Sequence, residues 1–131
     1  RRVLWKGFNH KLKGEGLFRF SLEDELSAKE EMLRPNVDLD LKIAVVSPEE
    51  NFVSYCGMWY DPAVEFALVE PVATDPEYRG LGLGKAAVLE GVRRVGLRGA
   101  KMALVGSSQQ FYYSIGFRPF ATSTNWKKKQ P

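Results

Sequence analysis

The sequence has 131 residues, of which 44% are hydrophobic and 27% are charged, values typical of one globular domain and far from those of disordered or fibrous chains. Its 19 basic and 16 acidic side chains give a net charge of +3, and the lysines at 127–129 account for that excess. The rest of the chain is electrically balanced, so nucleic acid is disfavoured as a partner. No apolar run is long enough to span a membrane, which predicts a cytoplasmic protein.

Cysteine and histidine are nearly absent, since Cys56 is the only cysteine and His10 the only histidine. An intrachain disulfide and a Cys/His zinc site are therefore excluded. A Ser-His or Cys-His nucleophile pair would need His10 to fold onto the site. Cys56 lies in a predicted strand among apolar residues, so we expect a buried thiol there.

Residues 1–40 predict a helical region rather than a strand. The apolar residues near the N-terminus have the spacing of a short helix. Ser21 and Asp24 have the spacing of a capping pair at the start of a second helix, which continues to Leu33 and ends before Pro35.

From residue 41 the hydrophobic pattern becomes that of strands separated by short turns, which predicts an antiparallel meander followed by a helix. A strand that follows this helix must run parallel to the earlier one. The predicted elements are strands at 41–46, 52–60 and 63–74, a helix at 84–97, a strand at 101–105, helical turns at 109–115 and a last strand at 117–126.

The segment between the third strand and the long helix carries the clearest chemical signal. Gly80, Gly82 and Gly84 alternate in a loop that leads into the N-terminus of the helix. Glycines allow backbone N–H groups to approach a ligand closely, and a helix N-terminus adds about half a positive charge. The segment therefore predicts an anion-binding loop, most naturally for a phosphate.

Two common nucleotide-binding patterns do not fit this loop. The P-loop requires four residues between its first glycine and Gly-Lys, followed by Ser or Thr. Here three residues separate them, and alanine follows the lysine. Residues 82–87 match the G-x-G-x-x-A form of the dinucleotide fingerprint, but no acid occurs at 101–108 and the loop follows an antiparallel meander.

A third pattern, Arg-x-x-Gly-x-Gly, is met by Arg79 to Gly84. With it the chain resembles the GNAT superfamily, the Gcn5-related N-acetyltransferases, in which this motif binds the pyrophosphate of acetyl-CoA. Asp75 to Gly80 is similar to the family's lead-in to the motif, and Tyr112 to Phe117 is similar to its later Tyr-x-x-x-Gly-Phe motif. The order and spacing of these segments agree over residues 41–120.

The resemblance implies a mixed α/β fold of the GNAT type, with a mostly antiparallel central sheet, a splayed parallel strand pair and flanking helices. It also implies an N-acetyltransferase that uses acetyl-CoA and no metal, and that passes the acetyl group to a primary amine by direct attack. The chain would then form a single GNAT-like domain, 1–131, made of an N-terminal helical region at 1–40, a sheet and cofactor-binding core at 41–126 and a basic tail at 127–131.

The resemblance further implies where the cofactor binds. Backbone groups of Val72 and Thr74 would pair with the pantetheine arm between the two diverging strands, and backbone amides at 81–86 would hold the pyrophosphate. Lys85 would either add charge near a phosphate or be a solvated lysine, and Ser107 would either contact the cofactor or cap a helix. The implied cofactor-binding residues are Val72, Ala73, Thr74, Arg79, Gly80, Leu81, Gly82, Leu83, Gly84, Lys85, Ala86 and Ser107.

Two residues are candidates for the proton transfers of the reaction. Tyr112 matches the position from which many family members direct a phenol at the CoA sulfur, so it is the candidate general acid, and a packing role is the alternative. Glu70 is the candidate general base, acting through water, because the strand alternation is expected to place it on the same face as Leu68 and Val72. Glu65 is the alternative base on this strand, and Glu70 would then be structural.

Two strands of the family pattern are hard to find, because no strand precedes the first helix and only 14 residues follow Phe117. Such a sheet has unprotected edges. We therefore expect a second protomer or a companion domain to complete it, and Arg1 as first residue suggests a domain of a longer chain. The alternative function is a noncatalytic acyl-CoA-binding or regulatory module.

Overall fold

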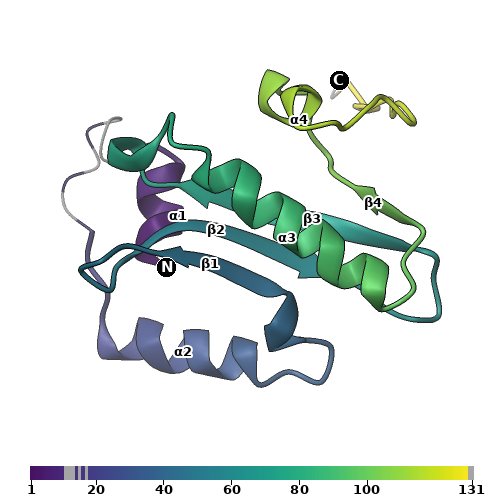
Figure 1. Ribbon diagram of the computed structural model, residues 1–131. Helices are drawn as coiled ribbons and strands as arrows, with labels where there is room; N and C mark the ends of the chain where they lie inside the picture. The colour runs from purple at the N-terminus through teal and green to yellow at the C-terminus, as the bar shows by residue number, and fades with distance from the viewer. Residues whose placement is uncertain (11–13, 15, 17, 130–131) are drawn as a thin grey trace.

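A four-stranded mixed sheet forms the centre of the computed structural model, which describes residues 1–10, 14, 16 and 18–129 (Figure 1). The first three strands form an antiparallel meander, and the fourth is parallel to the third. The strands are β1 (Lys42–Val46), β2 (Phe52–Trp59), β3 (Phe66–Thr74) and β4 (Met102–Leu104). The helices are α1 (Arg2–Gly7), α2 (Leu22–Met32), α3 (Leu83–Leu97) and α4 (Gln110–Ser114), with 3-10 turns η1 (Leu39–Leu41) and η2 (Pro76–Tyr78). The predicted mixed α/β fold with one parallel strand pair is confirmed.

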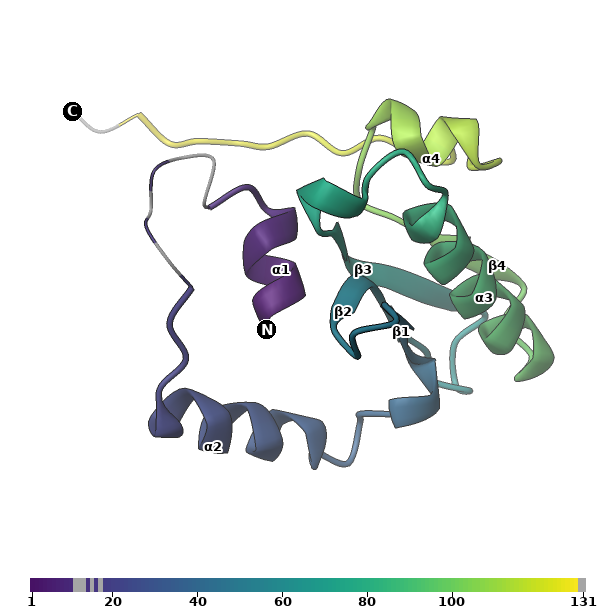
Figure 2. The ribbon, with the colours of Figure 1, turned by 60° about the vertical axis from the view of Figure 1, so that its left-hand side comes forward.

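The sheet is covered by different helices on its two faces. Figure 2 shows α3 on one face and α1 on the other. The core lies under α3, where buried side chains of β2 and β3 meet buried residues such as Val88 and Val95 of the helix. Gly91 allows this close approach, because a Cβ there would lie 2.7 Å from Cγ of Met58. The helix and the sheet thus share the hydrophobic core.

The predicted capped helix near the N-terminus is confirmed as α2. The Ser21 hydroxyl accepts a hydrogen bond from the Asp24 N–H, and the Asp24 carboxylate accepts one from the Ser21 N–H. This reciprocal pair satisfies two N–H groups that a helix start leaves without partners. None of the described residues of α2 is buried, so local interactions support this helix more than packing does.

A β-bulge changes the faces of β3. Val69 pairs with Met58 and Val72 pairs with Cys56, so Glu70 and its neighbour at 71 together oppose a single residue of β2. Val69 and Val72 therefore both face the core under α3. The prediction that Glu70 shares a face with Val72 is wrong, because simple alternation does not hold across a bulge.

Strands β3 and β4 separate after a short region of pairing. Leu68 pairs with Leu104, and β3 continues to Thr74 without a strand on that side in the described part of the chain. The Asp75 N–H donates to the Val53 carbonyl of β2 at 2.8 Å. Since peptide groups alternate along a strand, those of Thr74 face away from β2, toward the gap.

The predicted last strand at 117–126 is not formed, because residues 117–129 adopt neither helix nor strand. A strand requires a neighbouring edge, and Figure 2 shows this segment running away from β4 after α4. Beyond Phe117 its large side chains are exposed, at 68% for Phe120 and 91% for Trp126. No described helix combines the length and apolarity that a membrane span requires.

The buried cysteine generates a prediction about pH. Burial raises the pKa of the Cys56 thiol to about 12, above its ordinary value of 9.0, because desolvation disfavours the thiolate. The free energy of unfolding should therefore be independent of this group below pH 9.0 and should fall as the pH rises from 9.0 toward 12, since only the unfolded chain then releases the proton.

Denaturant unfolding across this pH range, compared with the Cys56→Ala variant, isolates the contribution of the thiol. The native protein should also resist alkylation by iodoacetamide at about pH 8 and react once unfolded. Rapid alkylation of the native protein would show that the thiol is accessible and would contradict the prediction.

Candidate active site

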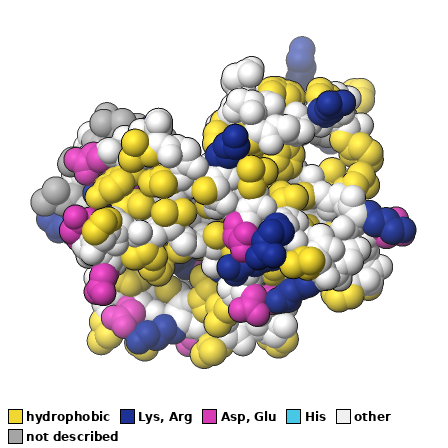
Figure 3. Space-filling view, viewed as in Figure 1, with side chains coloured by type: hydrophobic (Ala, Val, Ile, Leu, Met, Phe, Trp, Pro, Cys, Tyr) yellow, Lys and Arg dark blue, Asp and Glu magenta, His cyan; other side chains and the backbone are white. Residues whose placement is uncertain are grey.

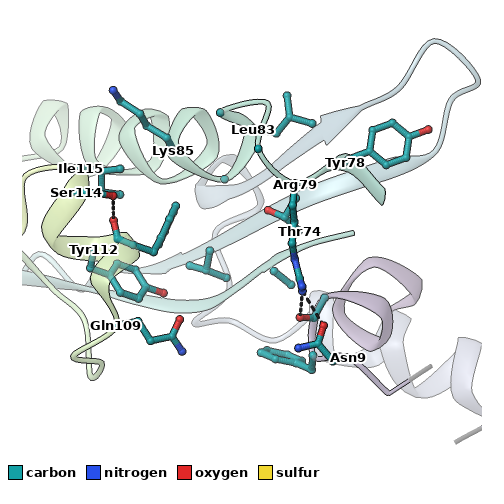
Figure 4. Close-up of a pocket in the computed structure, with 18 residues that line it drawn as sticks. Asn9, Thr74, Tyr78, Arg79, Leu83, Lys85, Gln109, Tyr112, Ser114 and Ile115 are labelled. Atoms are coloured by element: carbon teal, nitrogen blue, oxygen red, sulfur yellow. Dashed lines mark hydrogen bonds between the residues drawn. The ribbon is translucent and has the colours of Figure 1, made fainter. Parts of the chain in front are cut away.

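A cavity of about 850 Å³ lies at the carboxyl end of β3 (Figure 4). Three parts of the chain surround it: the glycine loop that leads into α3, the helix α4 and the end of α1. The gap between β3 and β4 thus opens into a cavity walled by segments far apart in the sequence. Its lining residues are Gly7, Phe8, Asn9, Val72, Ala73, Thr74, Tyr78, Arg79, Gly80, Gly82, Leu83, Gly84, Lys85, Gln109, Phe111, Tyr112, Ser114 and Ile115.

Glycine is required in the loop for two different physical reasons. Gly82, the N-cap of α3, has a φ of 78°, a left-handed conformation that other residues rarely adopt. Gly84 has ordinary backbone geometry, but a Cβ there would lie 3.1 Å from the Thr74 hydroxyl and 3.4 Å from the Phe111 ring. The first glycine allows the turn, and the second allows α3 to begin close to the end of β3.

The backbone N–H groups of residues 80–85 donate to no acceptor in the described part of the chain. The N–H of Ala86 does donate, to the Gly82 carbonyl at 3.0 Å, in the first intrahelical bond of α3. Unpaired N–H groups and the positive end of the helix dipole together favour a negative charge. The loop therefore presents the donors that a bound anion requires.

The charged side chains that line the cavity are those of Arg79 and Lys85, and no carboxylate is among the lining residues. The Arg79 guanidinium donates to the Gly7 carbonyl and to Oδ1 of Asn9, both at 2.9 Å. Lys85 is exposed, and in Figure 4 its ammonium group points away from Tyr112. The cavity is thus cationic, as an anionic ligand requires.

The acidic side chain of α3, Glu90, pairs with arginines of the same helix and not with the cations of the cavity. Glu90 accepts hydrogen bonds from Arg93 and Arg94 on the outer surface of α3, and these bonds lower its pKa to about 2. Figure 3 shows acidic and basic side chains next to one another over this part of the molecule. The positive charge at the cavity is therefore not cancelled by α3.

Tyr112 is buried in the cavity wall, with 8% of its surface exposed. Its ring packs edge to face against those of Phe111 and Phe117, with centroids 5.0 and 5.7 Å apart, and its hydroxyl points into the cavity (Figure 4). Burial raises the pKa of the Tyr112 phenol, and Cys56 adds to this effect. The phenol therefore stays protonated at neutral pH and has a proton to donate.

The hydroxyl of Thr74 is held in place from behind. The Ser54 hydroxyl, which is completely buried, lies 2.8 Å from that of Thr74 and donates to the Ala73 carbonyl at 3.3 Å. A buried hydroxyl with two partners restricts the rotamer of its neighbour. Thr74 thus contributes a fixed polar group to the cavity wall.

Most of the predicted site residues line one cavity, and four do not. Leu81 lies in the loop and Ala86 in α3, and neither is among the residues that line the cavity. Ser107 accepts a hydrogen bond from the Gln109 N–H in the turn before α4. Glu70 is exposed on the other face of β3 because of the bulge. The residues brought together are Val72, Ala73, Thr74, Arg79, Gly80, Gly82, Leu83, Gly84, Lys85 and Tyr112.

Sequence reasoning missed Tyr78 and two groups of lining residues. Those of α4 have a signal, because Phe111 and Ile115 are four residues apart and share a helix face with the neighbouring Tyr112. The residues 7–9, at the end of α1, have none, because they meet the glycine loop across about 70 positions of sequence. The alternative base, Glu65, pairs with Lys101 at the opposite end of β3.

Comparison with known proteins agrees with this architecture. Residues 40–119 match the family described as the acetyltransferase (GNAT) domain. No curated protein matches the sequence in a direct comparison. An acetyltransferase of Trypanosoma brucei has a TM-score of 0.61 at 20% identity, covering 85% of this chain and 82% of its own.

Two further solved structures share the fold. Glucosamine-6-phosphate N-acetyltransferase from Arabidopsis thaliana has a TM-score of 0.63 at 16% identity, covering 96% of this chain and 92% of its own. AAC(6')-Iy in complex with the bisubstrate analogue CoA-S-monomethyl-acetylneamine has a TM-score of 0.61 at 13% identity, covering 84% and 82%. These similarities concern the fold, and the family match spans more than half of the sequence. The chain therefore belongs to the GNAT acetyltransferase family.

Proposed function

We propose that this chain is an acetyl-CoA-dependent N-acetyltransferase that passes the acetyl group directly to a primary amine. The observation that carries the proposal is the loop at 80–85, whose N–H groups have no acceptor in the described chain and border a cavity with only cationic charge. Such an arrangement suits a diphosphate, because several donors and a helix N-terminus meet at one place. Membership of the GNAT family supports the same ligand.

The roles of the lining residues follow from their chemistry. The loop amides would hold the diphosphate, while the backbone groups of Val72 and Thr74 that face the gap would pair with the pantetheine arm. Acetyl-CoA, when bound, supplies a thioester carbon for the attack by the amine. Tyr112 would give its proton to the CoA sulfur as the thiolate leaves.

The proton released by the amine needs an acceptor other than Tyr112, and no carboxylate is among the residues that line the cavity. We propose that Glu70 receives it through water, from its exposed position at the bulge of β3. Glu70→Gln should then lower kcat/KM at neutral pH, with recovery as the pH rises and the amine loses its proton without help. A pH–rate profile for Glu70→Gln that matches that of the wild-type protein would remove Glu70 from the mechanism.

The activity is tested by supplying acetyl-CoA with a panel of amines and following the release of free thiol. The panel should include amino sugar phosphates and aminoglycosides, because some similar solved structures are named as acetyltransferases of such compounds. Thiol release that depends on one class of amine supports the proposal. Tight binding of acetyl-CoA without turnover on any amine would favour the noncatalytic acyl-CoA-binding module instead.

The glycine loop predicts the effect of Gly82→Glu on cofactor binding. Any side chain at a φ of 78° strains the backbone, and the carboxylate would place negative charge where the phosphate is proposed to bind. Titration calorimetry should show a loss of CoA affinity of about 100-fold or more, roughly 2.7 kcal/mol.

Gly14→Glu is the matched control, because Gly14 has the same φ of 78°, also has open space around it, and lies outside the cavity. It introduces the same charge and the same backbone strain. Equal losses of CoA affinity in the two variants would mean that the effect arises from strain or net charge and not from the cavity.

The proposed acid predicts the effect of Tyr112→Phe on the rate. Removing the phenol proton should lower kcat by about 100-fold, while the affinity for acetyl-CoA stays within about twofold, because the ring packing is kept. Tyr113→Phe is the control, since Tyr113 is an exposed neighbour on the same helix. If both variants turn over at the wild-type rate, the thiolate leaves without an acid from this helix.

A further inference from the structure

The end of α1 is clamped to the turn that precedes the glycine loop. The Lys6 ammonium lies 3.1 Å from the Asp75 carboxylate and 3.9 Å from that of Glu77. From the other side of the same contact, the Arg79 guanidinium donates to the Gly7 carbonyl and to Oδ1 of Asn9, at the end of α1. The Asp75 partner is 4% exposed, so this clamp includes a partly desolvated charge pair, which salt screens less than an exposed one.

Asn9 has a backbone suited to this contact. Its φ of 65° is in the left-handed region, which asparagine adopts more readily than other residues with a side chain. This conformation lets the chain turn back at the end of α1, and the side-chain oxygen meets the guanidinium of Arg79 at the cavity wall (Figure 4). Asn9 is thus placed by its own backbone preference.

The chemistry of the Asn9–Arg79 contact leaves Arg79 able to bind an anion. A guanidinium has five N–H donors, and the bonds to Gly7 and Asn9 leave several of them open. The amide of Asn9 is neutral, so it fixes the direction of the guanidinium without cancelling its charge. A carboxylate in this position would hold the guanidinium but would neutralise it.

We propose that Asn9 is a positioning residue that orients the Arg79 guanidinium toward a phosphate group of coenzyme A. The inference rests on the proposed function, since it assigns to α1 a part in the same cofactor site. Arg79 is exposed and has a long side chain, which loses much rotamer freedom when it is fixed by a ligand. An orienting contact reduces this loss on binding.

The test uses Asn9→Gly, which removes the amide and tolerates the left-handed backbone. Its control is Glu50→Gly, because Glu50 has a φ of 64° in the turn after β1 and does not line the cavity. Calorimetric titration with CoA should show affinity about 3- to 10-fold weaker for Asn9→Gly and unchanged for Glu50→Gly. Thermal unfolding of both variants checks that each is folded.

A double-mutant cycle shows whether Asn9 acts through the guanidinium. In an Arg79→Gln background, Asn9→Gly should change the CoA affinity by less than about twofold, because no guanidinium remains to be oriented. The loss caused by Asn9→Gly alone should also shrink as salt is added, since a guanidinium–phosphate contact is screened.

Repeating the titrations with dephospho-CoA identifies the phosphate. An undiminished effect of Asn9→Gly assigns the diphosphate, and an effect confined to CoA assigns the 3′-phosphate. Wild-type affinity in Asn9→Gly, or an equal loss with and without Arg79, overturns the inference and leaves the proposed function intact. Failure of the wild-type protein to bind CoA overturns both.

Discussion

Strand β3 separates from β4 after Leu68, and the candidate site depends on that separation. The sheet holds the two strands together at one end and leaves the other end of β3 without a partner on this side in the described chain. From there β3 continues into η2 and the glycine loop, while β4 leads to α4 and Tyr112. The unpaired loop amides and the phenol are therefore carried by two segments whose relative position is set by the same hydrogen-bonded strand pair.

Charge is distributed unevenly over a chain that is nearly balanced as a whole. At the surface, acidic groups form ion pairs with arginines. Glu90 on α3 pairs with Arg93, and the aspartates of η1 and its N-cap pair with Arg98. The cavity keeps two cations and no acid among its lining residues. Net charge alone gives no indication of this arrangement, because it depends on which surface each side chain occupies.

The sequence allowed correct prediction of those features that local rules determine. The glycine loop, the capping box of α2 and the meander each follow from residue types at short spacing, and all are present. The face of Glu70 was predicted wrongly, because the bulge at 70–71 breaks the alternation; Pro71, which has no N–H for the ladder, is the local signal that alternation alone did not use. The strand at 117–126 is not formed although β4 has a free edge in the described part of the chain, because residues 117–129 run away from that edge, and alternation alone does not show where a segment will lie.

The buried Ser54 hydroxyl behind the cavity bears on how the hydroxyl proton of Thr74 is oriented. A carbonyl oxygen only accepts, so the contact between Ser54 and Ala73 uses the single proton of Ser54. Either hydroxyl can donate in the 2.8 Å contact between Ser54 and Thr74, and when the Ser54 proton goes to Ala73 this contact uses the proton of Thr74. In that arrangement Thr74 turns lone pairs toward the cavity, where they match an amide N–H of a bound molecule and repel a carbonyl or phosphate oxygen.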